Sequence, residues 1–402
     1  MKSKNILFIT HTYTTFQKTQ IEGIANKFAN VYVLVRYKPI AEISQIIPIR
    51  FLRTHSKSKA IDLYKKPQNV HVIPVPMFYL PFKLSYLRLG DRLFRKIEKI
   101  IKQKAITFDL IHAHYFWTSG YIAKKLKDEH NIPIVVTNHS TMQLTEYLSR
   151  SSKWQFKMYE TIKNTDHIIV VNQFMKEKVE QIDKNLRVDI IPAGFDQNIF
   201  YPIETDEARK ELDLPPDYPI VINISSLDDN KNLDLFIKGI TKLLPTFPNL
   251  RGFIIGNGQK YNHLQNLIDS LRVNENIKLI GHVLHQKINY WINASNVVSL
   301  CSFSEGSPTV MYESLACGKP FLGSNVGGIP EIIKPGEFGQ VFDPYQVDDF
   351  VDKIYQMLNQ KWDRQKIIQY GNKYSQSNLS EKIINIYKNL VDESSKYLID
   401  LY

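Results

Sequence analysis

The segment Ser302–Glu331 reads SFSEGSPTVMYESLACGKPFLGSNVGGIPE and holds the most informative pattern of the chain. Two glutamates, Glu305 and Glu313, lie eight positions apart, and Glu305 follows the apolar run Val297–Leu300. Gly306-Ser307-Pro308 then opens a segment with helical apolar spacing, and its proline stands where the first helical turn tolerates one. The segment therefore predicts a strand, a turn with Glu305 on it, and a helix that carries Glu313 about a turn and a half inside.

The start of such a helix is suited to an anion, because its N–H groups lack partners and carry partial positive charge. A diphosphate is a ligand of this kind. Glu305 precedes the helix and could accept hydrogen bonds from sugar hydroxyls. Glu313 could hold a ribose diol, or it could be an ordinary surface residue of the helix, and the spacing alone leaves both interpretations open.

Outward from this segment, short β-branched runs alternate with amphipathic helical patterns in two series. Such alternation predicts parallel sheets covered by helices on both faces, and two series predict two Rossmann-like α/β lobes. The expected strands of the first series are 5–9, 31–35, 70–75, 109–112, 133–137, 167–171 and 187–191, and those of the second are 220–224, 252–255, 277–280, 297–300 and 320–323.

The lobes are expected to join near Gly194–Pro202, where Gly, Pro and Asp cluster. We assign 1–197 to an N-terminal, acceptor-side lobe and 198–384 to a C-terminal, donor-binding lobe. The tail from Asn378 has a helical pattern, and residues 385–402 are expected to complete the first lobe. In open α/β sheets ligands bind at the carboxyl ends of strands, so the site is expected in a cleft between the two sheets.

Further short motifs occur in order along the chain. They are Asp109-Leu110-Ile111-His112-Ala113-His114, Thr137-Asn138-His139, Ile191-Pro192-Ala193-Gly194-Phe195-Asp196, Leu227 with Lys231-Asn232, Gly256-Asn257-Gly258, Gly281-His282-Val283 and Gly327-Gly328-Ile329-Pro330-Glu331. With the Glu–seven residues–Glu pattern at 305–313, this collinear set resembles the GT4-type retaining glycosyltransferases (glycosyl transferases group 1), which have the two-lobed GT-B fold. The resemblance runs over nearly the whole chain and is strongest in its second half.

The resemblance implies roles by position. Glu305 would contact the donor sugar, Glu313 the ribose, and Lys231 the diphosphate leaving group. His139 would meet the sugar at the reacting face, so His139, Glu305 and Lys231 are the expected catalytic set. Other expected donor contacts are Gly306, Ser307, Pro308, Thr309, Val310, Ser226, Gly256, Asn257, His282 and Val283, and the acceptor-side contacts are Thr14, Thr15 and His114.

Two departures from the family pattern keep other functions open. The family has an arginine where this chain has Ser226, and a glycine-rich first loop where it reads His11-Thr12-Tyr13-Thr14-Thr15-Phe16-Gln17. A catalytically silent nucleotide- or glycan-binding partner of an assembly complex is therefore one alternative. A nucleotide-sugar epimerase on the same fold is another, although acid and base residues for it are not identifiable.

Charge divides the chain unevenly: residues 1–195 carry a net +16 and the rest −5. The segment Arg36–Lys104 alone carries +12 and includes the aromatic, basic stretch Met77–Leu89. This composition favours an anionic membrane surface as a partner, besides a nucleotide-sugar and a glycan or lipid-linked acceptor. A solvated helix face with a covering loop is the plainer interpretation. Nucleic acid is not expected, because no recognised binding module appears.

Neither metal nor another cofactor is expected. The chain has no Asp-x-Asp motif, and His112 and His114 lack a third ligand at metal spacing. The two cysteines, Cys301 and Cys317, predict a reducing compartment and buried thiols. With no signal peptide and no membrane-spanning run in this sequence, we expect a cytoplasmic protein, peripheral on the inner face of the cell membrane if the basic segment contacts lipid.

Overall fold

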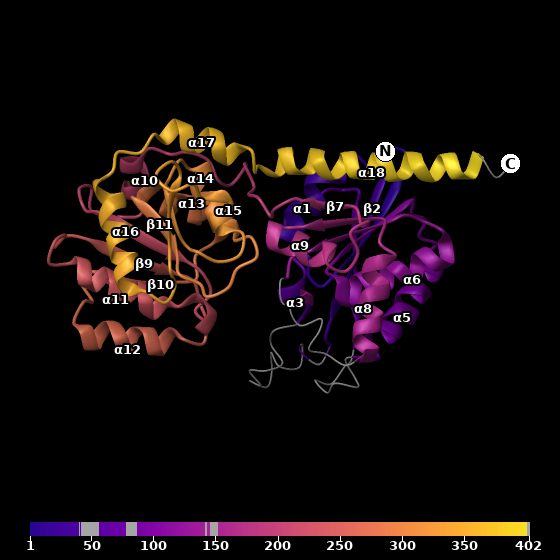
Figure 1. Cartoon of the computed structure of the whole chain (residues 1–402), viewed down its shortest axis with the longest axis horizontal. Coiled ribbons are helices and arrows are strands. Elements are labelled where there is room, and N and C mark those ends of the chain that lie inside the picture. Colours follow the sequence, from indigo (N-terminus) through magenta and orange to yellow (C-terminus); the bar gives the residue numbers. More distant parts are fainter. Residues whose placement is uncertain (40, 42–55, 78–86, 141–142, 145–151, 400–402) are drawn as a thin grey trace. The chain divides into compact units, whose positions relative to one another are not determined.

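The computed structural model describes residues 1–39, 41, 56–77, 87–140, 143–144 and 152–399, with the side chains of 152 and 394–399 left aside. It divides into two units (Figure 1). Met1–Pro192 and Leu379–Tyr402 form the first, and Ala193–Asn378 form the second. The sequence placed these boundaries at 197/198 and 384/385, so both lie a few residues earlier in the structure.

The first unit is built on seven parallel strands in the order β3-β2-β1-β4-β5-β6-β7. They are β1 (Asn5–Thr10), β2 (Asn30–Tyr37), β3 (Val70–Pro76), β4 (Leu110–His114), β5 (Ile134–Asn138), β6 (His167–Val170) and β7 (Val188–Ile190). All seven predicted strands are present. They read as continuous apolar runs because a parallel sheet buries both of its faces.

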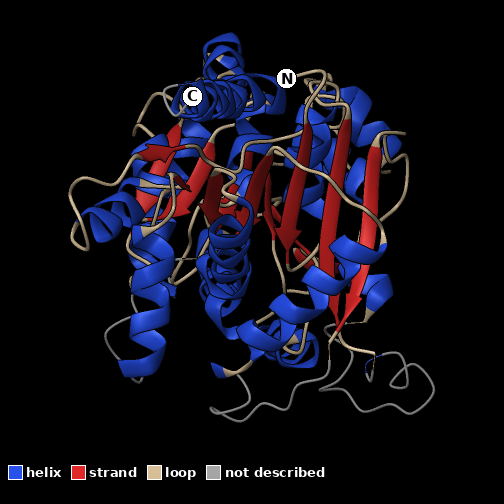
Figure 2. Ribbon diagram, turned by 90° about the vertical axis from the view of Figure 1, so that its right-hand side faces the viewer, coloured by secondary structure: helices blue, strands red, loops and turns tan. Residues whose placement is uncertain are grey.

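Successive side chains of β1 show the two buried faces directly. Leu7 and Ile9 pack with helices α5 (Leu89–Gln103), α6 (Tyr121–His130), α8 (Ser152–Lys163) and α9 (Gln173–Glu180). Ile6 and Phe8 point the other way, toward α1 (Thr15–Ala25), α3 (Lys57–Ala60) and the last helix, α18 (Gln376–Ile399). Helices therefore lie on both sides of the red strands in Figure 2.

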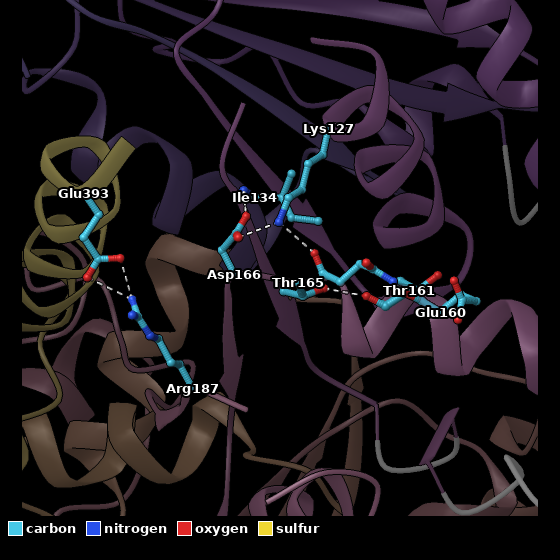
Figure 3. Close-up of polar contacts among 9 residues, drawn as sticks. Lys127, Ile134, Glu160, Thr161, Thr165, Asp166, Arg187 and Glu393 are labelled. Carbon is cyan, nitrogen blue, oxygen red and sulfur yellow. Dashed lines mark hydrogen bonds and ion pairs between the residues drawn. The ribbon is translucent and has the colours of Figure 1, made fainter. Parts of the chain in front are cut away.

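The last helix belongs to the core of the first unit. Ile383 and Tyr387 of α18 are fully buried among side chains of β1, β2 and α1. Arg187, just before β7, adds an exposed ion pair to Glu393 at 2.7 Å (Figure 3). Exposed pairs contribute little, about 0–1 kcal/mol, so apolar burial holds the helix in place.

Figure 3 also shows Lys127 of α6 paired with Asp166, which accepts the Ile134 N–H.

The second unit has six parallel strands in the order β10-β9-β8-β11-β12-β13. They are β8 (Ile220–Ile224), β9 (Arg251–Ile255), β10 (Ile277–Gly281), β11 (Val297–Leu300), β12 (Phe321–Ser324) and β13 (Gly339–Phe342). The edge strand β13 was not predicted from the sequence. Its sequence is GQVF, and it begins with Gly339 at φ +156 followed by Gln340, so only two of its four residues carry an apolar signal.

Helices of the second unit cover both faces of its sheet. One core holds α13 (His285–Ala294), α14 (Thr309–Ala316) and α17 (Arg364–Asn372), and the other holds α11 (Leu233–Leu243), α12 (Tyr261–Leu271) and α16 (Val347–Asn359). The short helices are α10 (Thr205–Glu211), α15 (Ile329–Ile332) and the 3-10 turn η3 (Asp229–Lys231).

Strand order marks one functional position in each sheet. In the first unit β1 neighbours β4, and in the second β8 neighbours β11, so the connections leaving these pairs run in opposite directions along the sheet. Open α/β sheets bind ligands outside the carboxyl ends of strands at such a switch point. The loops after β1, β4, β8 and β11 are therefore the ones to inspect, and the sequence alone did not give this order.

Candidate active site

The loop after β8 is packed against the loop after β9 through glycines. Gly256 has φ +148, and a Cβ there would stand 1.8 Å from the Ser225 carbonyl oxygen. A Cβ on Gly258 would stand 2.3 Å from the Leu227 oxygen. The Leu227 N–H donates to the Asn257 oxygen at 3.1 Å. The glycines of the Gly-Asn-Gly motif therefore allow the loops after β8 and β9 to approach closely, because neither position has room for a side chain.

Ser226 occupies the position of the absent family arginine. Its exposed hydroxyl donates to Asp228 Oδ2 at 2.6 Å, and Asp228 Oδ1 accepts the Asn230 N–H at 3.0 Å to cap η3. The serine thus closes its own turn. Serine carries no positive charge, so a phosphate bound at this loop would need a cation from another residue.

Lys231 and Glu305, expected to contact the diphosphate and the donor sugar respectively, form one ion pair. Lys231 Nζ lies 2.6 Å from Glu305 Oε1, and both side chains are largely buried. Asn230 fixes the two loops together, because its carbonyl accepts the Phe303 N–H at 2.8 Å and its amide donates to the Ser304 oxygen at 2.9 Å. The structure therefore joins the loops after β8 and β11 at the switch point of the sheet.

The Gly-Gly-x-Pro-Glu turn supports the loop that carries Glu305. Gly327 has φ +55, and a Cβ there would stand 1.9 Å from the Glu305 carbonyl oxygen. The Gly328 N–H donates to the Gly306 oxygen at 3.0 Å. The two motifs recognised in the sequence are thus one structural element, in which glycines allow backbone to lie on backbone.

The helix α14 begins one residue later than expected. Pro308 is its cap, in extended conformation, and Thr309 is its first residue. Thr309 and the buried Val310 lie in the first turn, where N–H groups have no intrahelical acceptor. Ser307 is partly buried, and its hydroxyl lies 2.7 Å from that of Tyr312. Because the Ser307 hydroxyl is already hydrogen-bonded to Tyr312, we expect a ligand to contact the backbone N–H of Ser307 instead.

Glu313 lies on a buried face of α14 and not on the surface of the protein. Only 5% of the residue is exposed, so the surface interpretation was wrong. Burial raises the pKa of this carboxyl to about 7, and a hydrogen bond with Thr309 works in the opposite direction. A buried carboxylate with a raised pKa is typical of a functional position, because the fold loses stability by keeping it.

The loop after β10 adds His282 and Val283 to this edge of the sheet. Gly281 has φ +80, and its oxygen accepts the Gly256 N–H at 2.9 Å. His282 is exposed and Val283 is partly buried. The predicted donor-binding residues of the second unit therefore lie on the loops after β8, β9, β10 and β11 and on helix α14, which follows the last of these loops.

In the first unit, the structure brings His114 and His139 together. His114 Nδ1 lies 2.9 Å from His139 Nε2, at the ends of the neighbouring strands β4 and β5. Burial lowers the pKa of His114 to about 3 and that of His139 well below its usual range. Both imidazoles are therefore neutral at neutral pH, and each has one donor and one acceptor nitrogen.

Thr14 and Thr15 stand at the start of α1, in the loop after β1. Thr14 caps the helix without a side-chain hydrogen bond, and Thr15 is exposed with φ +40. Phe16 meets the edge of the His139 ring at 4.8 Å. The hydroxyls of both threonines are thus available at the same sheet edge as His139.

Sequence reasoning missed an aromatic pair at this edge. His11, after β1, stacks on Tyr115, after β4, with ring centres 4.8 Å apart. The hydroxyl of Tyr115 accepts from Gln17 at 3.4 Å. The sequence carried one signal for this pair, since His11 and Tyr115 lie two and three positions after the predicted strands 5–9 and 109–112.

Among the described residues, no group of three or more His, Cys, Asp or Glu side chains is arranged so that it could hold a metal ion. Cys301 and Cys317 are buried, and burial raises the pKa of both thiols. No described helix is long and apolar enough to cross a membrane. Residues 78–86 of the basic aromatic stretch, with Lys83, lie outside the described residues.

Two parallel α/β sheets, each with polar side chains on the loops at its switch point, define the class of GT-B glycosyltransferases. The model of the family described as Glycosyl transferases group 1 matches residues 204–374, and that of Glycosyltransferase Family 4 matches residues 51–198. Together the two matches span most of the chain, and both describe glycosyltransferases of the GT4 type.

Known relatives and structures agree with this assignment. A D-inositol 3-phosphate glycosyltransferase of Corynebacterium aurimucosum is 24% identical over an alignment 387 positions long, which covers 89% of this chain and 90% of the relative. The fold matches sucrose-phosphate synthase of Thermosynechococcus elongatus with a TM-score of 0.77 at 18% identity, covering 97% and 100% of the two chains. It matches HepE of Anabaena, solved in complex with UDP-glucose, with a TM-score of 0.69 at 17% identity, covering 96% and 100%.

Proposed function

We propose that this glycosyltransferase moves a sugar from a nucleotide-sugar to an acceptor hydroxyl with retention of anomeric configuration, in cell-surface polysaccharide or glycolipid assembly. The observation that carries the proposal is the arrangement at the switch point of the second unit. There the Lys231–Glu305 pair and the first turn of α14 gather on one sheet edge, and α14 also carries the buried Glu313. A cation, free N–H groups and two carboxylates suit a nucleoside diphosphate linked to a sugar.

In this proposal each group has a distinct task. Glu313 accepts hydrogen bonds from the ribose hydroxyls, and Glu305 accepts from hydroxyls of the donor sugar. Lys231 moves between two anions, because its ammonium already pairs with Glu305 and a bound diphosphate competes for it. The proposed task of His139 is to contact an oxygen of the donor sugar. A donor complex of HepE with UDP-glucose supports a nucleotide-sugar as the donor class.

The bond changes follow from these tasks. The glycosidic C–O bond to the diphosphate breaks, and the acceptor oxygen forms its bond on the same face of the sugar. The acceptor proton passes to an oxygen of the leaving diphosphate, so no protein base is required. Lys231 and the N–H groups of α14 stabilise the charge that develops on the diphosphate, and preorganised donors of this kind supply most of the rate. The chemistry is proposed to need no metal.

The basic charge of the first unit is proposed to face an anionic acceptor or membrane surface. Helix α5 buries Leu93 and Ile97 while exposing Arg92 and Arg95. A groove of about 590 Å³ beside it is lined by five cationic side chains, two acidic ones, the exposed Phe156 and others, the cations being Arg88, Lys124, Lys125, Lys153 and Lys157. Binding there would keep the protein peripheral on the inner face of the cell membrane.

A panel of nucleotide-sugars, led by UDP-glucose, tests the central proposal. The purified chain should slowly hydrolyse one donor without an acceptor, and Lys231→Ala should remove that hydrolysis. Lys287→Ala is the matched control, because Lys287 is also paired with a glutamate, at 3.3 Å, but is exposed. A protein that binds one of the nucleotides and hydrolyses none of the donors would contradict transfer.

That outcome would favour the silent binding partner, which one observation supports. The turn at Ser226 is closed by Asp228, so the loop that in the family brings an arginine instead places a carboxylate near the phosphate loop. In that case the Glu305–Lys231 pair would persist in the nucleotide complex rather than opening.

A further inference from the structure

Three histidine rings of the first unit stack in the order His112, His114 and His139. The centres of the first two rings are 5.0 Å apart at an interplanar angle of 22°, and those of the next two are 5.1 Å apart at 20°. His112 and His114 are two positions apart on β4 and so face the same side. His139 follows β5, whose Thr137 pairs with His114 in the sheet register. The fold therefore forms the stack from two adjacent strand ends.

His112, at the inner end, has a partner on each ring nitrogen. Its Nδ1 is bonded to the hydroxyl of Tyr387 on α18, and its Nε2 lies 2.7 Å from the hydroxyl of Thr137. All three residues are fully buried. The inner ring is therefore fixed in orientation and supports the ring of His114 that stacks on it.

His114, in the middle, has a partner on only one nitrogen. Its Nδ1 contacts His139 Nε2, while its Nε2 is buried and finds no hydrogen-bond partner among the described residues. One hydrogen must lie between the two contacting nitrogens. If His139 donated it, neutral His114 would carry its own hydrogen on Nε2, as a buried N–H without an acceptor. If His114 donates it, Nε2 keeps only a lone pair. Orphaned buried N–H groups are the rarer case.

We propose that His114 is a positioning residue, which donates from Nδ1 to His139 Nε2 and fixes His139 as the tautomer with its hydrogen on Nδ1. The rings of Phe16 and Tyr115 pack against the His139 ring in T-shaped arrangements, with ring centres 4.8 and 5.4 Å away, and hold it in this orientation. This inference rests on the proposed function, in which His139 meets the donor sugar. There it presents an N–H donor to an oxygen of the sugar or of the leaving phosphate, and it has no lone pair with which to act as a base.

Nuclear magnetic resonance of the full chain with ¹⁵N-labelled histidine tests the tautomer without any substrate. Two-bond ¹H–¹⁵N correlations separate a protonated ring nitrogen from a bare one, and His114→Gln and His139→Gln assign the two rings among the 11 histidines. We expect Nδ1 protonated and Nε2 bare in both. A His139 ring protonated on Nε2 would overturn the inference.

A pair of variants then tests the positioning. His114→Phe keeps a ring in the stack and removes the donor, so His139 should become a mixture of tautomers. The kcat for transfer should fall about 3- to 10-fold, as expected for one lost hydrogen bond, with the donor KM little changed. Thr137→Val is the control, since it removes a partner of His112 only. Its His139 should keep one tautomer, and an equal effect of both variants would contradict the inference.

The two proposals fail separately. If no nucleotide-sugar is consumed but His139 carries its hydrogen on Nδ1, the tautomer stands and the enzymatic role falls. If transfer is active and His139 carries its hydrogen on Nε2, the proposed enzymatic function stands, and His114 does not position His139.

Discussion

Replacing Glu313 with glutamine should weaken the site and strengthen the fold at once. The carboxyl is 5% exposed, and burial raises its pKa from an ordinary 4.5 to about 7. In a folded chain above pH 7 it is a buried anion, and the difference in pKa corresponds to a cost of about 3 kcal/mol. Glutamine fills the same space without charge. A charge-assisted hydrogen bond contributes about 1.5–3 kcal/mol, so nucleotide affinity should fall roughly 10- to 100-fold.

The pH dependence of this effect follows from the direction of the shift. Because the folded-state pKa of Glu313 lies above the unfolded one, its contribution to stability is fully present below about pH 4.5. It is lost as the pH rises through 7. The variant and the native chain should therefore melt together at pH 4.5 and separate above pH 7, where the variant melts at a temperature higher by the order of 5–10 °C.

Differential scanning calorimetry at both pH values and titration calorimetry with the nucleotide of the preferred donor measure the two halves of this prediction. Glu275→Gln is the matched control, because Glu275 is exposed on the same unit and both quantities should stay unchanged. An unchanged melting temperature at pH 8 would refute the buried anion, and an unchanged affinity would remove Glu313 from the site.

Three further outcomes are expected. Transfer should survive EDTA yet be nearly abolished in Lys231→Ala; activity silenced by EDTA and restored by Mn²⁺ would show that a metal meets the diphosphate. Gly327→Ala should lower the melting temperature and donor hydrolysis, because its Cβ would lie 1.9 Å from a carbonyl oxygen. Gly336→Ala, at φ +81 with nothing within 4 Å, carries the backbone strain alone and should have a smaller effect in both assays. Binding to anionic vesicles should weaken as salt rises and in the double variant of Arg92 and Arg95 to glutamine, with donor hydrolysis intact; a native chain that ignores such vesicles at low salt refutes membrane contact.

The alternation of apolar runs was enough to predict both sheets, because parallel strands buried on two faces leave a continuous signature. It missed β13, in which a glycine and a glutamine precede the two apolar residues Val341 and Phe342. Strand order was also beyond the sequence. Adjacency of β1 to β4 and of β8 to β11 depends on contacts between residues more than 70 positions apart.

The residue types of the candidate site could be predicted, but their pairing could not. Glu305 and Lys231 were both named from motifs, yet nothing in a sequence shows that a lysine 74 positions earlier lies 2.6 Å from the glutamate. The burial of Glu313 could not be predicted from the sequence either. Helix α14 has eight residues and is buried on several sides, so its sequence does not divide into an apolar face and a polar face. Tyr387 had no signal at all, because its partner His112 lies 275 positions away.

The return of α18 to the first unit has a consequence for synthesis on the ribosome. Side chains of α18, among them Leu379, Ile383 and Tyr387, complete a core whose members outside this helix all lie before position 192. At translation rates of 5–20 residues per second, the nascent first unit waits roughly 10–40 s for that helix, with this face of its sheet covered only in part, by α1 and α3. During that interval the second unit emerges and can fold on its own. The half of the chain that is made first is therefore the last to be finished.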